Sequence, residues 1–179
     1  MRYKKIKSKI SYKNPWFKIE DHTVIRPNGK KGIYSFLKKS SGVVIIALDD
    51  DKSIFFTKEY RYPINKKVWQ LPAGSMEGKN ILKEGKKELF EETGLKAKNI
   101  KKIGGFFIAP GHEDTFVHVL LATNLDKSKI GLDFKGGDED ISEIKNIKIA
   151  KVKNMTEKGE INCGISVAAL NIFLCNKNY

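Results

Sequence analysis

Residues 74–95 read GSMEGKNILKEGKKELFEETGL and give the clearest indication of the fold. From Asn80 onward the residues are helical in pattern, and Gly94 is a typical C-terminal stop. The stretch therefore predicts a loop followed by a helix from Asn80 to about Thr93. Two leucines, Leu82 and Leu89, are expected on one side of this helix, where they can pack against a sheet.

The glutamates of this helix share one stripe. At about 100° of turn per residue, all of them fall within an arc of roughly 100°: Glu84, Glu88, Glu91 and Glu92. Neighbouring like charges repel by roughly 0.2–0.5 kcal/mol per pair in water, and by more in a pocket. A hard cation such as Mg²⁺ removes that repulsion, because it prefers carboxylate oxygens and leaves other positions for water and phosphate. The stripe by itself indicates either a cation site or a solvated acidic face paired with nearby lysines.

The second half of the stretch resembles the Nudix box, whose metal-binding half reads Arg-Glu, an apolar residue, any residue, Glu-Glu, any residue, Gly and an apolar residue. Residues 87–95, KELFEETGL, match this pattern except for lysine in place of arginine. The first half departs from it, because the loop after Gly74 is one residue short and Lys79 stands where a glutamate is expected. Glu77 and Glu84 are candidates to compensate. Gly85 inside the helix costs about 1 kcal/mol relative to alanine.

Working outward from the helix, the sequence predicts an α+β protein. Apolar runs predict strands near residues 42–48, 53–57, 68–71, 103–108, 116–125 and 144–152, and a second helix at 166–175. Strands interleaved with helices favour a mixed β-sheet sandwiched between helices, and the resemblance implies the Nudix fold. The 179 residues suit a single domain, 1–179. Within it we expect residues 1–41 to form an N-terminal β arm or hairpin and residues 42–179 the catalytic core.

Composition argues against several other classes of protein. The net charge of +13 raises the possibility of a nucleic-acid partner. That partner is judged unlikely, because only Arg2, Arg26 and Arg61 are arginine and the lysines are spread along the chain. No long apolar stretch predicts a membrane segment or a signal peptide. Two cysteines without a motif, Cys163 and Cys175, suit a reducing compartment, so a cytoplasmic location is expected.

Over residues 12 to 172 the chain resembles one branch of the family, the ADP-ribose pyrophosphatases. In that group the metals, Mg²⁺ or Mn²⁺, are held by a backbone carbonyl and glutamates. The resemblance places these ligands at Ala73, Glu88, Glu91 and Glu92, and it gives Glu88 and Glu92 a catalytic role. The segments that carry it, in chain order, are Asn14–Phe17, Pro27–Gly29, Lys58–Tyr62, Trp69–Gly74, Ala109–Gly111, Gly159–Ile161 and Ala168–Leu170.

The resemblance also implies roles around the substrate. Glu139 resembles the loop glutamate near the attacking water, so it is the first candidate for general base, and Glu113 is the second. Arg61 matches a phosphate-binding arginine, although a structural arginine at a strand end is the alternative. Trp16 and Tyr34 are candidates for stacking on the base, with simple packing as the alternative. Relatives exchange the N-terminal arm between two subunits, which implies a homodimer.

The expected function is metal-dependent hydrolysis of the pyrophosphate bond of ADP-ribose or a related nucleoside diphosphate sugar such as GDP-mannose. Two alternatives stay open at this point. One is a non-catalytic Nudix-fold module that binds a nucleotide or RNA, and the other is pyrophosphate removal from RNA 5′ ends. The sequence does not decide between base and sugar.

Overall fold

The structure is a computed structural model that describes residues 2–131 and 140–176. The chain forms two compact units. The first consists of residues 1–41 and 107–116, and the second of residues 42–106 and 117–179.

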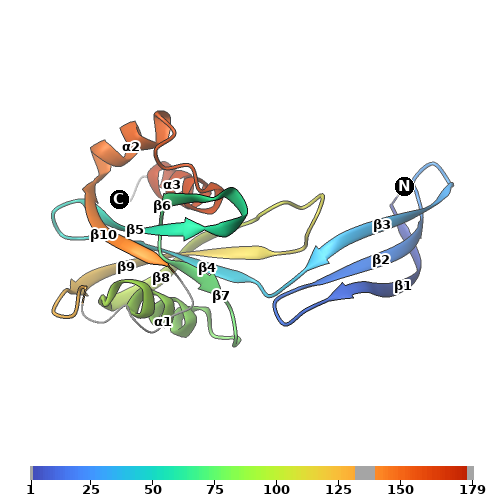
Figure 1. Cartoon of the computed structure of the whole chain (residues 1–179), viewed down its shortest axis with the longest axis horizontal. Helices are drawn as coiled ribbons and strands as arrows, with labels where there is room; N and C mark the ends of the chain where they lie inside the picture. Colours follow the sequence, from blue (N-terminus) through green and yellow to red (C-terminus); the bar gives the residue numbers. More distant parts are fainter. Residues whose placement is uncertain (1, 132–139, 177–179) are drawn as a thin grey trace. The chain divides into compact units, whose positions relative to one another are not determined.

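The first unit is built on a three-stranded antiparallel sheet in the order β1-β2-β3 (Figure 1). The strands are β1 (Lys4–Lys13), β2 (Lys18–Ile25) and β3 (Lys31–Lys38). Residues 107–116 join this sheet through a hydrogen bond of 2.9 Å from the Leu37 amide to the His112 carbonyl. The expected N-terminal β region is therefore confirmed.

The second unit contains two sheets. One has the order β7-β4-β9-β8 and the other β10-β5-β6. The central strands β4 and β9 run parallel, and β4 pairs with β7 antiparallel. The strand bounds are β4 (Gly42–Ala47), β5 (Ser53–Arg61), β6 (Lys66–Gln70), β7 (Ala73–Ser75), β8 (Lys96–Phe107), β9 (Phe116–Asp126) and β10 (Ile141–Lys148).

Helices cover this second unit on both sides, as expected (Figure 1). Helix α1 (Ile81–Thr93) packs against β4 and β7, while α3 (Gly164–Cys175) also contacts β4. Helix α2 (Ile149–Glu157) contacts β10. The strand β4 is apolar on both faces, with Val44, Ile45 and Ile46 fully buried, because both of its faces are covered.

The structure differs from the sequence expectations in three segments. The strand expected at 144–152 is wrong in its second half, because the chain turns at Lys148 into α2 and buries Val152 and Met155 on one helical face. Strand β7 was not expected, since a three-residue strand exists only through its pairing with β4. Strand β8 begins earlier than expected. Within the described part of the chain, no helix is long and apolar enough to cross a membrane.

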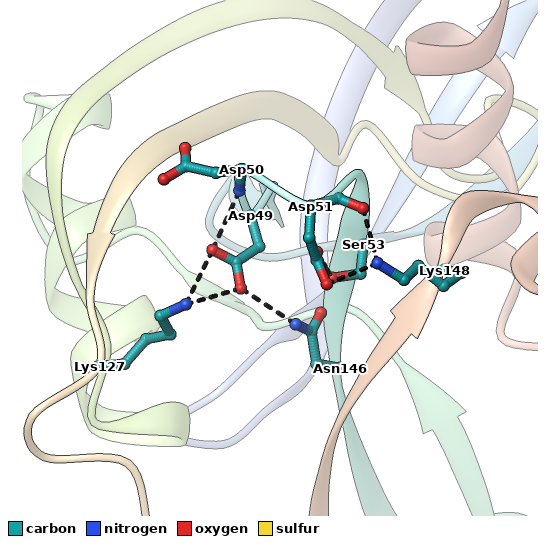
Figure 2. A network of polar contacts seen from close by, with 7 residues as sticks. All are labelled: Asp49, Asp50, Asp51, Ser53, Lys127, Asn146 and Lys148. Atoms are coloured by element: carbon teal, nitrogen blue, oxygen red, sulfur yellow. Dashed lines mark hydrogen bonds and ion pairs between the residues drawn. The ribbon is translucent and has the colours of Figure 1, made fainter.

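A polar network secures the turn between β4 and β5 (Figure 2). Asp49, 9% exposed, accepts hydrogen bonds of 2.9 and 3.1 Å from Lys127 Nζ and one of 3.1 Å from Asn146 Nδ2. Asp51 accepts one of 2.6 Å from Lys148 Nζ, and the side chain of Asp50 points away from the others. The network ties this turn to β10 and to the end of β9.

Candidate functional site

Helix α1 carries the glutamates, and its ends are set by local sequence. The Asn80 side chain accepts hydrogen bonds of 3.1 Å from the amides of Leu82 and Lys83. At the other end Gly94 adopts a left-handed conformation with φ 73°, which favours glycine. Of the two leucines expected to pack on the sheet, Leu89 is fully buried but Leu82 is 37% exposed. The expectation is therefore confirmed for Leu89 and wrong for Leu82.

Gly85 allows α1 to approach the sheet closely. A Cβ at this position would lie 2.2 Å from Leu120 Cδ1 and 3.3 Å from Ile100 Cδ1. The helix interior glycine, unfavourable for the isolated helix, is therefore explained by packing against β9 and β8. The close approach at Gly85 holds α1 against the sheet, and the helix also packs against β7.

The structure brings Glu88, Glu92 and Ala73 together. Glu92 is 2% exposed, and its Oε1 accepts a hydrogen bond of 3.1 Å from the Ala73 amide. The Glu88 carboxylate lies over the backbone of Gly74, since a Cβ on Gly74 would be 2.2 Å from Glu88 Cδ. Two carboxylates from α1 thus lie against the backbone of β7 and form one corner with it, to which Ala73 contributes its amide as a hydrogen-bond donor.

Glu91 lies apart from this corner. Its side chain is 55% exposed, and the Lys87 Nζ is 3.9 Å from its Oε2. In the described part of the chain, no three His, Cys, Asp or Glu side chains converge as a metal cluster. The sequence-predicted set is therefore divided, with Glu88 and Glu92 at the backbone of β7 and Glu91 at the surface.

Lys87, which stands in the place of the arginine of the box, forms an ion pair with Glu77. Its Nζ lies 3.0 Å from Glu77 Oε2. This hydrogen bond is the largest cause of a raised pKa for Lys87, and the charge of Glu91 also raises this pKa, while burial lowers it. Of the two residues considered as compensation, Glu77 makes the pair. It links the loop before α1 to the helix at a site where both side chains are exposed.

Glu84 is a buried carboxylate one turn before Glu88. It is 8% exposed, and its Oε1 lies 3.0 Å from where a Cβ on Gly78 would be. Among the described residues its buried Oε2 has no hydrogen-bond partner. Glu84 therefore places a carboxyl group beside the loop that precedes the helix.

Arg61, at the end of β5, is held by two buried neighbours. Its Nη1 is 2.8 Å from Glu59 Oε1, while Nε and Nη2 donate bonds of 3.1 and 2.9 Å to Gln70 Oε1. Gln70 in turn donates to Glu59. Glu59 is 3% exposed and the Arg61 side chain 43% exposed, so one edge of the guanidinium is anchored and another part faces solvent.

Sequence reasoning missed Glu59 and Gln70. Both lie inside the segments Lys58–Tyr62 and Trp69–Gly74 that carried the resemblance. Glu59 is two residues before Arg61 on one strand, and side chains two apart share a face of the strand. That spacing is the signal that could have found the pair.

The remaining candidates lie in the first unit or outside the described residues. Trp16, 79% exposed, sits in the β1–β2 turn, where Asn14 Oδ1 accepts a hydrogen bond of 2.9 Å from its amide. Tyr34, in β3, donates a hydrogen bond of 3.0 Å to the Gly111 carbonyl. Strand β3 pairs Tyr34 with His22, whereas Trp16 precedes the first paired residue of β2, Lys18. The two aromatic residues are therefore not neighbours along this sheet.

Of the two candidate general bases, Glu113 is among the described residues and Glu139 is not. Glu113 lies in the loop between β8 and β9, with its Oε2 3.6 Å from Lys39 Nζ. Its side chain is 14% exposed. Glu139 lies outside the described residues.

Two family models match this chain. Residues 38–162 match the family model described as the NUDIX domain, and residues 3–37 match the nucleoside diphosphate sugar hydrolase N-terminal domain. The chain belongs to the Nudix family. Its expected standing as an enzyme, a Nudix hydrolase similar to ADP-ribose pyrophosphatases, is thereby confirmed.

The relatives of this Nudix chain carry different names. A Bacillus subtilis protein named ADP-ribose pyrophosphatase is 31% identical over 138 residues, which cover 75% of this chain and 72% of the relative. A Bacillus methanolicus protein named methanol dehydrogenase activator is 29% identical over 133 residues, 73% of this chain and 72% of the relative. A crystal structure of an ADP compounds hydrolase has the same fold, with a TM-score of 0.81 at 17% identity, and covers 97% of this chain and 93% of that one.

Proposed function

We propose that this Nudix hydrolase cleaves the pyrophosphate bond of ADP-ribose, or of a related nucleoside diphosphate sugar, in a reaction that depends on Mg²⁺ or Mn²⁺. The observation that carries the proposal is the corner formed by Glu88, Glu92 and the backbone of Ala73. The name of the Bacillus subtilis relative supports ADP-ribose as the first substrate. GDP-mannose is the second.

The residues present fit a divalent metal. Carboxylate and carbonyl oxygens are the donors that Mg²⁺ prefers, and Mg²⁺ uses one or two carboxylates while keeping water and substrate phosphate as other ligands. Glu88 and Glu92 supply two such carboxylates beside Ala73, with Glu91 as a further candidate. When bound, the metal neutralises the diphosphate and lowers the pKa of a water molecule.

The chain's own residues bind and orient the substrate. The solvent-facing part of Arg61 would contact phosphate oxygens, while Glu59 and Gln70 hold the guanidinium in position. Trp16 and Tyr34 would contact the base. Glu139 is proposed to take the proton from the attacking water, with Glu113 as the second choice.

The test is turnover of a substrate panel with Mg²⁺, Mn²⁺ or a chelator. We expect AMP and ribose 5-phosphate from ADP-ribose, and loss of turnover with the chelator. Glu92→Gln should lower kcat by more than the roughly 10–100-fold typical of residues that only support a ligand, and exposed Glu91→Gln should lower it less. Turnover of nucleoside triphosphates or capped RNA alone would contradict the proposal.

The same panel separates the two candidate bases. Glu139→Gln should lower kcat more than Glu113→Gln, because only the general base takes a proton in the reaction. The reverse order would transfer this role to Glu113.

We also propose a homodimer formed through the N-terminal arm, in the cytoplasm. The arm exposes apolar side chains to an unusual degree, with Tyr3, Ile6, Ile10, Tyr12 and Ile33 each more than half exposed. Such surface is normally covered by a partner. A second copy of this chain is the partner that the family resemblance implies.

A further inference from the structure

A hollow runs between the outer side of α1 and strand β8. It consists of two adjoining cavities with volumes of about 500 and 590 Å³. Asn80, Leu82 and Ile100 line both of them. We call this hollow the α1–β8 groove.

The rims of the groove are basic. Lysines line it from the α1 side and from the β8 side, and among the described lining residues there is no Asp or Glu: Lys79, Lys83, Lys86, Lys98, Lys101 and Lys102. These lysines are distributed over residues 79–102 in the sequence, and the packing of α1 beside β8 places three of them around each of the two adjoining cavities. A basic concave surface concentrates anions.

The groove lies on the side of α1 away from the glutamates. At about 100° per residue, Leu82, Lys86 and Lys83 are centred roughly opposite the glutamate stripe. Gly85 and Leu89, between the two sides, face the sheet. A ligand in the groove would therefore leave the corner at Glu88 and Glu92 open.

An aromatic residue extends the same side of the helix. Phe90, one turn after Lys86, is 38% exposed, and Lys96 Nζ lies 5.3 Å from its ring centroid. An exposed ring beside lysines offers a face on which an unpaired base can stack.

We propose that the α1–β8 groove binds single-stranded nucleic acid through its phosphate backbone, independently of base sequence. Lysine contacts phosphate as a point charge, whereas readers of base edges rely on the planar fork of arginine, and no arginine lines the groove among the described residues. The apolar side chains of Leu82 and Ile100 and the Phe90 ring suit nucleotides whose bases are not paired. Such binding is a function additional to hydrolysis, because it uses neither Glu88 nor Glu92.

The test is fluorescence anisotropy with a labelled 20-nucleotide oligomer of mixed sequence across a salt series. The variant Lys83→Gln/Lys86→Gln/Lys98→Gln should bind at least about tenfold more weakly at low salt. Its slope of log affinity against log salt should be shallower by about 2, at roughly 0.7 per lost phosphate contact. The matched control is Lys151→Gln/Lys153→Gln/Lys158→Gln, which removes the same charge from exposed positions around α2.

A second groove variant, Lys79→Gln/Lys101→Gln/Lys102→Gln, should reproduce the loss, with melting temperature and hydrolysis checked for all variants. Equal weakening by the groove and control variants would overturn the proposal in favour of dispersed charge. Absence of binding by the unmodified protein at low salt would overturn it as well. Tighter binding of polyglutamate than of the oligomer would instead assign the groove to an acidic polypeptide.

Discussion

Four glutamates that look equivalent in the sequence have different surroundings in the structure. Glu92 and Glu84 are buried at 2% and 8% exposure, whereas the Glu91 side chain is 55% exposed and near Lys87. Burial raises the electrostatic cost of each negative charge unless it is compensated. A bound cation would therefore relieve a larger electrostatic cost at the buried glutamates than at the exposed Glu91.

Gly74 leaves the space beside its backbone that the Glu88 carboxylate occupies. Gly74→Ala would put a Cβ 2.2 Å from Glu88 Cδ, so we expect the carboxylate to shift and kcat to fall by at least about tenfold, in the range of lost ligand support. Steady-state kinetics with ADP-ribose measure this. The matched control is Gly164→Ala, where a Cβ meets nothing within 4 Å; equal activity of both variants would contradict the assignment of Glu88.

Glu20 gives the first unit a defined response to acid. Hydrogen bonds from Lys18 and then His22 lower the pKa of Glu20 from 4.5 to about 2. A carboxylate whose pKa is lower when folded stabilises the fold above the unfolded value and loses that contribution as pH falls. Between pH 4.5 and about 2, the melting temperature of the unmodified protein should therefore fall more than that of Glu20→Gln. Parallel pH curves for the two proteins would refute this role.

Among the elements, helix α1 has three sides, and each of them contacts a different part of the protein. Its sheet side carries Gly85 and Leu89, its inner edge carries Glu88 and Glu92, and its outer side lines the α1–β8 groove. The residues of the three sides alternate along the sequence, and the helical turn places them in different directions. A change on one side can therefore be tested without altering another.

Gly85→Ala tests how closely α1 approaches β9. Alanine stabilises an isolated helix by about 1 kcal/mol relative to glycine, but overpacking a core costs roughly 1–3 kcal/mol. Because Leu120 is fully buried and would be 2.2 Å from the new Cβ, we expect net destabilisation of up to about 2 kcal/mol. Urea denaturation measures it. A gain in stability would show that the helix has room to move.

The β4–β5 turn is stabilised by the side chain of Asp49 and not by that of Asp50. Asp49→Ala would leave Lys127 and Asn146 without this partner, and we expect the free energy of unfolding to fall by about 1–3 kcal/mol. Asp50→Ala is the comparison, because that exposed side chain points away from the network. Its effect should stay within about 0.5 kcal/mol. Similar losses for both variants, measured by chemical denaturation, would contradict the network's role.

At the scale of the whole molecule, the candidate residues are divided between the two units. Arg61, Glu88 and Glu92 belong to the second unit, and Trp16, Tyr34 and Glu113 to the first. Base contacts and phosphate chemistry are thus proposed for different units. Assembly of two copies is the step that the arm's exposed apolar residues support.

Light scattering after size exclusion tests that assembly. We expect the mass of a dimer, twice 20.3 kDa, for the unmodified protein. Ile6→Lys/Ile10→Lys should yield monomer, because burying two unpaired charges at an interface is unfavourable. Lys5→Gln/Lys9→Gln on the same strand is the control and should remain dimeric. A monomeric unmodified protein would refute arm-mediated assembly.

The glutamate-bearing helix, the strands β4, β5 and β9, and the membership of the Nudix hydrolase family could all be predicted from the sequence. These features depend on caps, periodicity and short motifs, which are local along the chain. Three features became apparent from the folded chain alone. Glu88 and Glu92 meet the backbone of β7 while Glu91 does not, Glu59 and Gln70 hold Arg61, and lysines far apart in the sequence line one groove. Each of these depends on residues brought together by packing, and spacing along one chain does not encode which side of an element its neighbours will cover.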